Sequence, residues 1–253
     1  MTLAFRHRPV PDSALARWDA RWKLAAVLVA VGAVASLNRL APAGAALALG
    51  VALLVFAKLP PGWVRSRLLL FAAGALPFVL VLPFALEGEG WDVGPVRLSG
   101  RGLAAGAAVL CRALAVGCFA LLLVGTAPLH HTLAAAHKLK VPGLLVQIAL
   151  LAYRYAFLLA DEMRRVRVAM RTRGFRVRAS RHGYRSLGHA AGALLVRGAE
   201  RADGVAAAMR CRGFGGQFHS LSAFTTRFAD ALGFVALAAA TIALVLWDRL
   251  GLS

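Results

Sequence analysis

Five apolar stretches divide this chain, and they restrict its possible folds more than any other feature of the sequence. They cover roughly residues 23–38, 43–59, 67–86, 102–126 and 228–247. A helix needs about 20 apolar residues to cross the hydrocarbon core of a bilayer, and backbone polar groups inside lipid must find hydrogen-bond partners within the protein. The sequence therefore predicts an all-α integral membrane protein with about five transmembrane helices. The first two stretches are short, and we expect them to form a tight helical hairpin.

The composition and the charge support the same class. The chain is 60% hydrophobic with a mean hydropathy of +0.69, and only 16% of its 253 residues are charged, against about 25% in a soluble domain. Its formal net charge is +19. In a soluble protein this excess would indicate nucleic acid, but no stacking platform of aromatic and basic residues is visible, and the positive-inside bias of membrane proteins explains the charge. We therefore expect contact with the lipid bilayer and no nucleic-acid partner.

The distribution of lysine and arginine predicts the orientation in the membrane. Basic residues occur in the N-terminal segment and in the loops 58–67 and 126–142, whereas the loop after the third stretch carries Glu87, Glu89 and Asp92. Basic loops remain on the cytoplasmic side. We therefore expect a multi-pass protein of the bacterial inner (cytoplasmic) membrane, with its N-terminus in the cytoplasm and the acidic loop outside.

This topology divides the chain into three parts. Residues 1–126 form a membrane domain with four N-terminal spans, residues 127–227 lie in the cytoplasm, and residues 228–253 contain the last transmembrane helix. The middle part holds the only extended stretch of the chain that is compatible with water.

Residues 143–160 are apolar enough to form a sixth span. A crossing would place Gln147 and Arg154 at membrane depth, where an arginine costs about 2.5–3.5 kcal/mol on the insertion scale. We therefore favour a helix that lies in or below the inner interface. The sequence leaves open whether this segment enters the membrane.

The middle part predicts two long helices. They cover residues 142–173 and 185–212, which corresponds to about 47 Å and 40 Å at 1.5 Å per residue. The second helix has an apolar stripe at helical spacing that includes Ala191, Gly198 and Ala202. Small residues allow helices to approach closely, so we expect the two helices to cross at these positions.

One phrase of seven residues occurs twice, once at the end of each long helix. It reads Ala-Met-Arg-Thr-Arg-Gly-Phe at 169–175 and Ala-Met-Arg-Cys-Arg-Gly-Phe at 208–214. A glycine that follows the last turn commonly ends a helix, and arginines there complement the negative end of the helix dipole. Capping alone, however, requires neither the preceding Ala-Met nor the following Phe.

The repeat therefore indicates a function beyond capping. Each helix end presents planar, permanently charged guanidinium groups that suit carboxylates, so two such tips are expected to bind two copies of a soluble partner. Contact of the basic strip 164–185 with phosphate or anionic lipid is an alternative, but it does not explain the repeat. The candidate site residues are Arg171, Arg173, Gly174, Arg210, Arg212 and Gly213.

These phrases carry a resemblance to a known family. Together with Tyr153-Arg154-Tyr155 and the run 161–165, the first phrase resembles the transmembrane (T) component of energy-coupling-factor (ECF) transporters. The segment 197–214 resembles the CbiQ-like cobalt/nickel subfamily in particular. Residues 19–24, Asp-Ala-Arg-Trp-Lys-Leu, are similar to the family's motif at the start of the first span, with alanine in place of proline. The resemblance covers nearly the whole chain.

The resemblance implies a non-catalytic, energy-coupling membrane subunit of an ATP-driven cobalt or nickel importer. In this family two long, crossing cytoplasmic coupling helices each seat a tip in one of two ATPase subunits, and the spans contact a separate membrane substrate-binding (S) subunit. Arg173 and Arg212 then correspond to the tip arginines. Thr172 and Cys211 stand where the family often has alanine. Two alternatives remain: a T component that serves a vitamin-binding S subunit, and a membrane interaction protein without an ATPase partner.

No motif predicts catalysis, a resident metal or a cofactor. The sequence lacks a Gly-x-x-x-x-Gly-Lys loop, so ATP hydrolysis is expected in a separate subunit. His130, His131 and His137 have no carboxylate or thiol close in sequence, and we expect them on a short amphipathic helix rather than in a metal site. Arg112 lies deep in an apolar stretch, where a functional role and snorkelling to the outer interface are equally supported.

Overall fold

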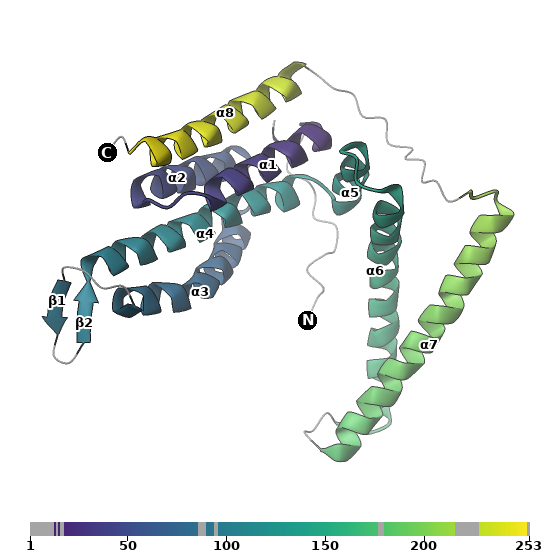
Figure 1. Cartoon of the computed structure of the whole chain (residues 1–253). Helices are drawn as coiled ribbons and strands as arrows, with labels where there is room; N and C mark the ends of the chain where they lie inside the picture. Colours follow the sequence, from purple (N-terminus) through teal and green to yellow (C-terminus); the bar gives the residue numbers. More distant parts are fainter. Residues whose placement is uncertain are drawn as a thin grey trace. The chain divides into compact units, whose positions relative to one another are not determined.

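The computed structural model describes residues 13, 15, 18–85, 90–93, 96–176, 180–215 and 228–251. Within these ranges it contains eight helices and one antiparallel two-stranded hairpin (Figure 1). The helices are α1 (Ala20–Ala35), α2 (Leu40–Phe56), α3 (Pro61–Ala85), α4 (Gly100–Thr126), α5 (Leu129–Lys138), α6 (Gly143–Thr172), α7 (Arg181–Cys211) and α8 (Phe228–Leu250). The strands are β1 (Gly90–Val93) and β2 (Val96–Ser99), which pair with Gly90 opposite Ser99. The prediction of an all-α integral membrane protein is confirmed, and this small hairpin is an addition to it. Glu87 and Glu89 of the acidic loop lie outside the described residues.

The chain divides into two units by its internal contacts. The first unit combines residues 1–139 with 222–253, and the second contains residues 140–221. Helix α5, which follows the sequence boundary at residue 126, packs on α1 in the first unit. The second unit contains α6 and α7, which lie between α5 and α8 in the sequence. The first unit is therefore made of two separate segments of the chain. The assignment of these parts to membrane and cytoplasm stays a prediction.

Helix length distinguishes the helices that could cross a membrane from those that are shorter than a membrane span. Four of the described helices, α3, α4, α6 and α8, are long and apolar enough to cross a membrane. Helices α1 and α2 have 16 and 17 residues, fewer than the roughly 20 that a crossing takes, although both are among the four N-terminal spans that the sequence predicts. Length and composition also allow α6 to cross, which is the possibility that the sequence leaves open. Helix α3 continues through Pro77 and Pro83, and Figure 1 shows it bent.

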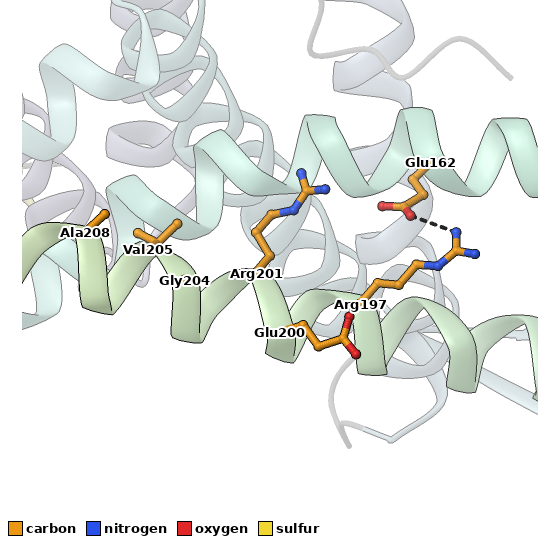
Figure 2. Close-up of a pocket in the computed structure, with 7 residues that line it drawn as sticks. All are labelled: Glu162, Arg197, Glu200, Arg201, Gly204, Val205 and Ala208. Carbon is orange, nitrogen blue, oxygen red and sulfur yellow. Dashed lines mark hydrogen bonds and ion pairs between the residues drawn. The ribbon is translucent and has the colours of Figure 1, made fainter.

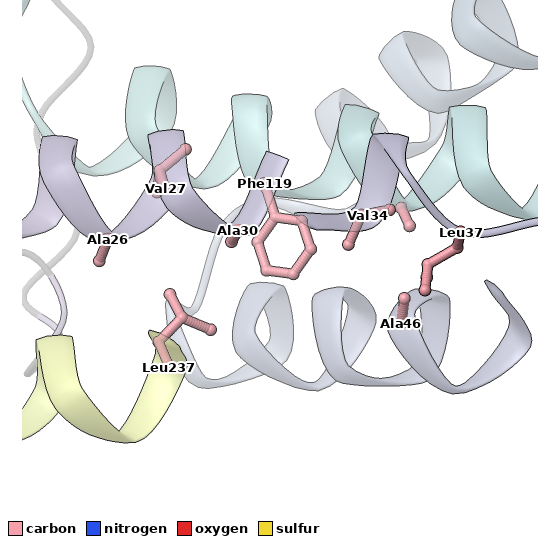
Figure 3. Packing of buried hydrophobic residues seen from close by; sticks show 9 residues of the cluster. Ala26, Val27, Ala30, Val34, Leu37, Ala46, Phe119 and Leu237 are labelled. Atoms are coloured by element: carbon pink, nitrogen blue, oxygen red, sulfur yellow. The ribbon is translucent and has the colours of Figure 1, made fainter. Parts of the chain in front are cut away.

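The core of the first unit lies between α1, α2, α4 and α8. Phe119 of α4 is completely buried and is the largest apolar side chain among the fully buried residues. It packs in a cluster in which alanines predominate (Figure 3), made of Ala26, Val27, Ala30, Val34, Leu37, Ala46, Ala115, Phe119 and Leu237. Lipid is as apolar as leucine, so membrane helices associate by close packing, and small residues favour this.

Helix α4 approaches two neighbours through glycines. A Cβ added at Gly102 would lie 2.6 Å from the carbonyl oxygen of Leu82 and 2.7 Å from Cα of Pro83, both in α3. On the other side, a Cβ added at Gly50 of α2 would lie 2.9 Å from Cβ of Cys118. These distances are shorter than real Cβ contacts, so the spacing of α2, α3 and α4 depends on the missing side chains.

Two buried aspartates join α8 to the N-terminal ends of α1 and α2. The backbone N–H of Asp19, the N-cap of α1, donates to Asp230 Oδ1 at 3.4 Å, and Trp18 Nε1 donates to the carbonyl oxygen of Asp230 at 3.0 Å. At the far end of α8, Asp248 accepts from the backbone N–H groups of Asn38 and Arg39, at 3.1 and 2.9 Å. Helix N-termini carry unpaired N–H groups and a partial positive charge. Each carboxylate therefore complements one helix end.

Arg112 closes the same end of the α1–α2 hairpin from α4. Its Nη1 donates to the carbonyl oxygens of Leu37 at 2.9 Å and Ala35 at 3.4 Å, which are orphan acceptors at the C-terminal end of α1. A cation at a helix C-terminus also complements the dipole. The sequence leaves open whether Arg112 has a functional role or snorkels to the outer interface. Its contacts show a third role, because Arg112 caps the C-terminal end of α1 within the protein.

Candidate functional site

The candidate site residues all lie at the ends of α6 and α7, which form the second unit. The observed helices match the predicted ranges 142–173 and 185–212, except that α7 begins four residues earlier, at Arg181. Ser180 explains this start, because its hydroxyl oxygen accepts from the backbone N–H of Gly183 at 3.1 Å. Serine is a favoured N-cap for this reason.

The two helices run antiparallel and are joined by an ion pair. Arg197 Nη1 of α7 lies 2.9 Å from Glu162 Oε1 of α6 (Figure 2). The carboxylate side chain is 11% exposed and the guanidinium side chain is 57% exposed. Figure 1 shows α6 and α7 running in opposite directions along the chain.

The prediction that small residues bring the two helices into close contact is wrong. A Cβ added at Gly198 would meet no atom within 4 Å, and Ala191 and Ala202 are exposed. From the ion pair toward the C-terminal end of α7 the two helices diverge (Figure 1), and the large side chains of Tyr155 and Leu159 occupy the facing side of α6. Gly198 and Ala202 therefore line a groove between the helices instead of a tight crossing.

The end of α6 is a Schellman motif. The backbone N–H of Phe175 donates to the carbonyl oxygen of Met170 and that of Gly174 to the carbonyl oxygen of Arg171, both at 3.0 Å. These two bonds define the motif. Gly174 has a φ of +78°, in the left-handed region that glycine adopts without steric cost.

The end of α7 repeats this geometry. Phe214 donates to Met209 at 3.1 Å and Gly213 donates to Arg210 at 3.0 Å through their backbone N–H groups, and Gly213 also has a φ of +78°. The exposure pattern over the seven residues is the same in both copies: Met and Phe are half-buried and the other five residues are exposed. The sequence repeat is therefore a structural repeat, which we call tip 1 (169–175) and tip 2 (208–214).

The structure corrects one step of the sequence argument. Met170 and Phe175 occupy the two positions whose hydrophobic contact commonly accompanies a Schellman motif. Capping therefore accounts for Met and Phe, contrary to the expectation that it does not. It does not require two exposed arginines at each tip.

The four tip arginines are available for an external partner. Arg171, Arg173, Arg210 and Arg212 are all exposed, and no carboxylate in the described parts of the chain forms an ion pair with any of them. Guanidinium groups in this state can form bidentate contacts with carboxylates of another molecule.

The antiparallel arrangement places the tips at opposite ends of the helix pair (Figure 1). Counted along the helices at 1.5 Å per residue, Gly174 lies roughly 18 Å beyond Glu162, and Gly213 roughly 24 Å beyond Arg197 in the opposite direction.

Histidines do not gather with acids or thiols in the described ranges. There, no group of three or more His, Cys, Asp and Glu side chains could hold a metal ion. His130, His131 and His137 lie on the short helix α5, whereas His182 and His189 lie on α7 in the other unit.

Comparison with known proteins decides the family. The sequence profile of CbiQ, described as a cobalt transport protein, matches residues 11–221. The chain belongs to the CbiQ family. The matched range contains α1 to α7 and both tips, and it ends before α8. This membership confirms the resemblance that the two arginine phrases indicate.

Two relatives show how far the likeness extends. The "Cobalt transport protein CbiQ" of Rhodobacter capsulatus is 32% identical over 216 residues, which are 83% of this chain and 85% of the relative. An uncharacterized protein of Methanocaldococcus jannaschii is 28% identical over 131 residues, which are 52% of this chain and 45% of that protein. With its long apolar helices, this CbiQ-family chain is a multi-pass membrane component of cobalt transport.

Sequence reasoning missed several residues that shape this CbiQ-family structure. It did not identify the Glu162–Arg197 pair or the helix-capping roles of Asp230 and Asp248. A signal for the aspartates exists, because acids near both ends of an apolar helix are costly unless they have partners. The ion pair has no such signal, since Glu162 and Arg197 each stand among other charged residues of amphipathic helices.

Proposed function

We propose that this protein is the energy-coupling membrane subunit of an ATP-driven cobalt importer of the ECF type. It has no catalytic role of its own: two ATPase subunits in the cytoplasm hydrolyse ATP, and a separate membrane S subunit binds the metal. The observation that supports this function best is the pair of tips at opposite ends of α6 and α7. Both present exposed arginines on the same Schellman geometry, and within the described chain these arginines have no ion-pair partner.

The mechanism follows from the tips and the length of the helices. When ATP closes the ATPase pair, the two sites that hold the tips move relative to each other. Arg173 and Arg212 move with these sites, because each is held there by a charged contact with the ATPase. Truncating one partner of such a buried, charged interface pair costs about 2–5 kcal/mol. The helices α6 and α7, with 30 and 31 residues, then transmit the motion as levers to the membrane helices that contact the S subunit.

The same proposal sets the location and the cargo. The N-terminus faces the cytoplasm and the protein lies in the bacterial inner membrane, in agreement with the basic residues around α1 and α6. The CbiQ family favours cobalt as the transported ion, with nickel, or a vitamin bound by another S subunit, as alternatives.

Co-purification with the partners tests the tips. The chain is expressed with its candidate ATPase and S subunits, and Arg173→Ala, Arg212→Ala and the double variant are compared with Arg165→Ala, which removes an exposed arginine of α6 outside both tips. We expect each tip variant to weaken ATPase binding about 30-fold or more and to reduce Co(II) uptake, whereas Arg165→Ala behaves like the unmodified protein.

The outcomes separate the candidate functions. Wild-type ATPase binding and Co(II) uptake by the double variant contradict the assignment of the tips. Failure of the unmodified chain to retain any ATPase favours the membrane interaction protein without an ATPase partner. An ATPase together with an S subunit that retains a vitamin instead of Co(II) or Ni(II) favours the vitamin transporter.

A further inference from the structure

The groove between α6 and α7 has apolar walls and arginines beside them. Its volume is about 640 Å³. Leu151, Tyr155 and Leu159 form the wall on α6, and Ala202 and Val205 contribute to the wall on α7. No part of the described chain fills this space, and its apolar walls are suited to a lipid chain.

Two guanidinium groups give the groove a positive charge. Arg201 and Arg210 both line it, and both residues are exposed. Figure 2 shows the side chain of Arg201 extending from α7 toward α6. Arginines in basic pockets between membrane helices bind the phosphates of anionic lipid headgroups, and their fork geometry suits phosphate oxygens.

The outer side of α6 next to the groove is open and apolar. Leu144, Leu145 and Ile148 are each more than half exposed, and α6 is apolar enough to lie in a membrane. The exposed apolar side chains on this side of α6 are suited to contact with lipid.

We propose that the groove binds one anionic glycerophospholipid, with its phosphate on Arg210 and an acyl chain along Tyr155 and Leu159. A phospholipid satisfies the apolar walls and the positive charge together. An apolar helix of a partner protein would satisfy only the walls. The two tips then differ, since Arg210 of tip 2 holds lipid while Arg171, its counterpart in tip 1, lies outside the groove. The proposal rests on the membrane location and does not depend on the ATPase.

Native mass spectrometry of the full-length chain in detergent tests this site. The delipidated protein is titrated with dioleoyl phosphatidylglycerol and, separately, with dioleoyl phosphatidylcholine. We expect one phosphatidylglycerol to bind about tenfold more tightly than phosphatidylcholine, because charged hydrogen bonds distinguish the two headgroups. Equal binding of both lipids overturns the proposal.

Matched variants locate the lipid in the groove. Arg210→Gln and Gly198→Leu are expected to lower phosphatidylglycerol affinity about tenfold, the first by removing the charge and the second by filling the groove. Arg171→Gln removes the equivalent charge of tip 1, and Gly192→Leu adds the same side chain to α7 outside the groove. A Cβ at either glycine meets no atom within 4 Å, so both leucine variants are expected to fold. Unchanged binding by Arg210→Gln and Gly198→Leu, or equal loss in the controls, overturns the proposal.

Two competitors distinguish the other occupants. Glycerol 3-phosphate, which carries the headgroup phosphate without acyl chains, is expected not to displace the lipid at millimolar concentration; displacement would assign a phosphate site instead. Purified S subunit is likewise expected to leave the lipid bound, and its displacement by that protein would assign a protein interface. Arg212→Ala is expected to retain phosphatidylglycerol while it loses the ATPase, so failure of the lipid site and failure of the proposed function are distinguishable.

Discussion

The backbone N–H of Arg39 donates a hydrogen bond of 2.9 Å to Asp248 Oδ1, across 209 residues of sequence. Arg39 is the N-cap of α2, and Asp248 lies in the last turn of α8. At the other end of α8, Asp230 makes the corresponding contact with the start of α1. Helix α8 is therefore tied to the N-terminal hairpin at both ends. These contacts join the last helix of the first unit to its first two helices, although α6 and α7 are inserted in the chain before it.

Loss of the Asp248 carboxylate should destabilise the first unit. Asp248→Ala leaves two backbone N–H groups at the start of α2 without their acceptor, and we expect a cost of about 1–3 kcal/mol. The readout is the melting temperature of the purified protein in detergent, measured by loss of the monodisperse species. Asp203→Ala, which removes an exposed acid of α7, serves as control. Equal melting temperatures of the two variants would contradict the capping role.

Arg112 should behave as a structural residue. Arg112→Met places an apolar side chain of similar length in α4 and removes the guanidinium that donates to the carbonyl oxygens of Leu37 and Ala35. Hydrogen bonds with a charged group contribute about 1.5–3 kcal/mol, so we expect a lower melting temperature with normal binding of the ATPase that we propose as a partner. Loss of Co(II) uptake at an unchanged melting temperature would instead assign Arg112 to transport.

The glycine contact between α3 and α4 should be sensitive to a single methyl group. Gly102→Ala places a Cβ against the backbone of Leu82 and Pro83, and overpacking of this kind costs about 1–3 kcal/mol. Gly74→Ala makes the same chemical change in α3, where the new Cβ meets no atom within 4 Å. We expect only Gly102→Ala to lower the melting temperature. A comparable loss in Gly74→Ala would mean that glycine flexibility, and not helix spacing, determines the effect.

Much of this fold is accessible from the sequence because its signals are local. Apolar stretches indicated α3, α4 and α8, and the repeated phrase located the ends of α6 and α7 to within a residue, because a glycine with positive φ ends a helix regardless of its surroundings. The exposure of the tip arginines also follows from their place at helix ends.

The remaining features depend on contacts between distant segments. Asp230 and Asp248 have their meaning only when α8 lies beside α1 and α2, which no local pattern specifies. The small residues of α7 misled the prediction for the same reason. A small side chain permits close approach, but the large residues on α6 decide whether it occurs, and Gly198 lines a groove instead.

Replacing Gly213, the glycine of tip 2 with a left-handed backbone conformation, should destabilise the end of α7 without affecting the rest of the protein. Gly213→Ala forces a φ of +78° on an alanine, which costs about 1–2 kcal/mol, although the added Cβ has free space. We expect faster hydrogen exchange of the Phe214 amide, which donates to Met209, without a change in the melting temperature of the first unit. Gly188→Ala, inside α7 and also facing open space, should leave the exchange of Phe214 unchanged. Protection of Phe214 in both variants would show that the motif tolerates a side chain.

The Glu162–Arg197 pair should set the distance between the two tips. No other ion pair joins α6 to α7 in the described part of the chain, and the helices diverge from it toward tip 2. Nitroxide labels on Cys211 and on a cysteine introduced at position 172 report this distance, with Cys111 and Cys118 replaced by alanine. We expect Arg197→Ala to broaden the distance distribution, since the largely buried carboxylate of Glu162 loses its partner.

Charge-reversal variants distinguish the contribution of the Glu162–Arg197 ion pair from that of the packing around it. Glu162→Arg or Arg197→Glu alone should broaden the distribution further, because like charges then face each other. The double reversal restores opposite charges and should narrow it again. Glu200→Gln, which neutralises an acid of α7 outside the pair, should leave the distribution as it is. A distribution of the same width in all variants would show that the helix pair is held by its apolar contacts and by the loop between the helices, and that the ion pair does not make it a rigid lever.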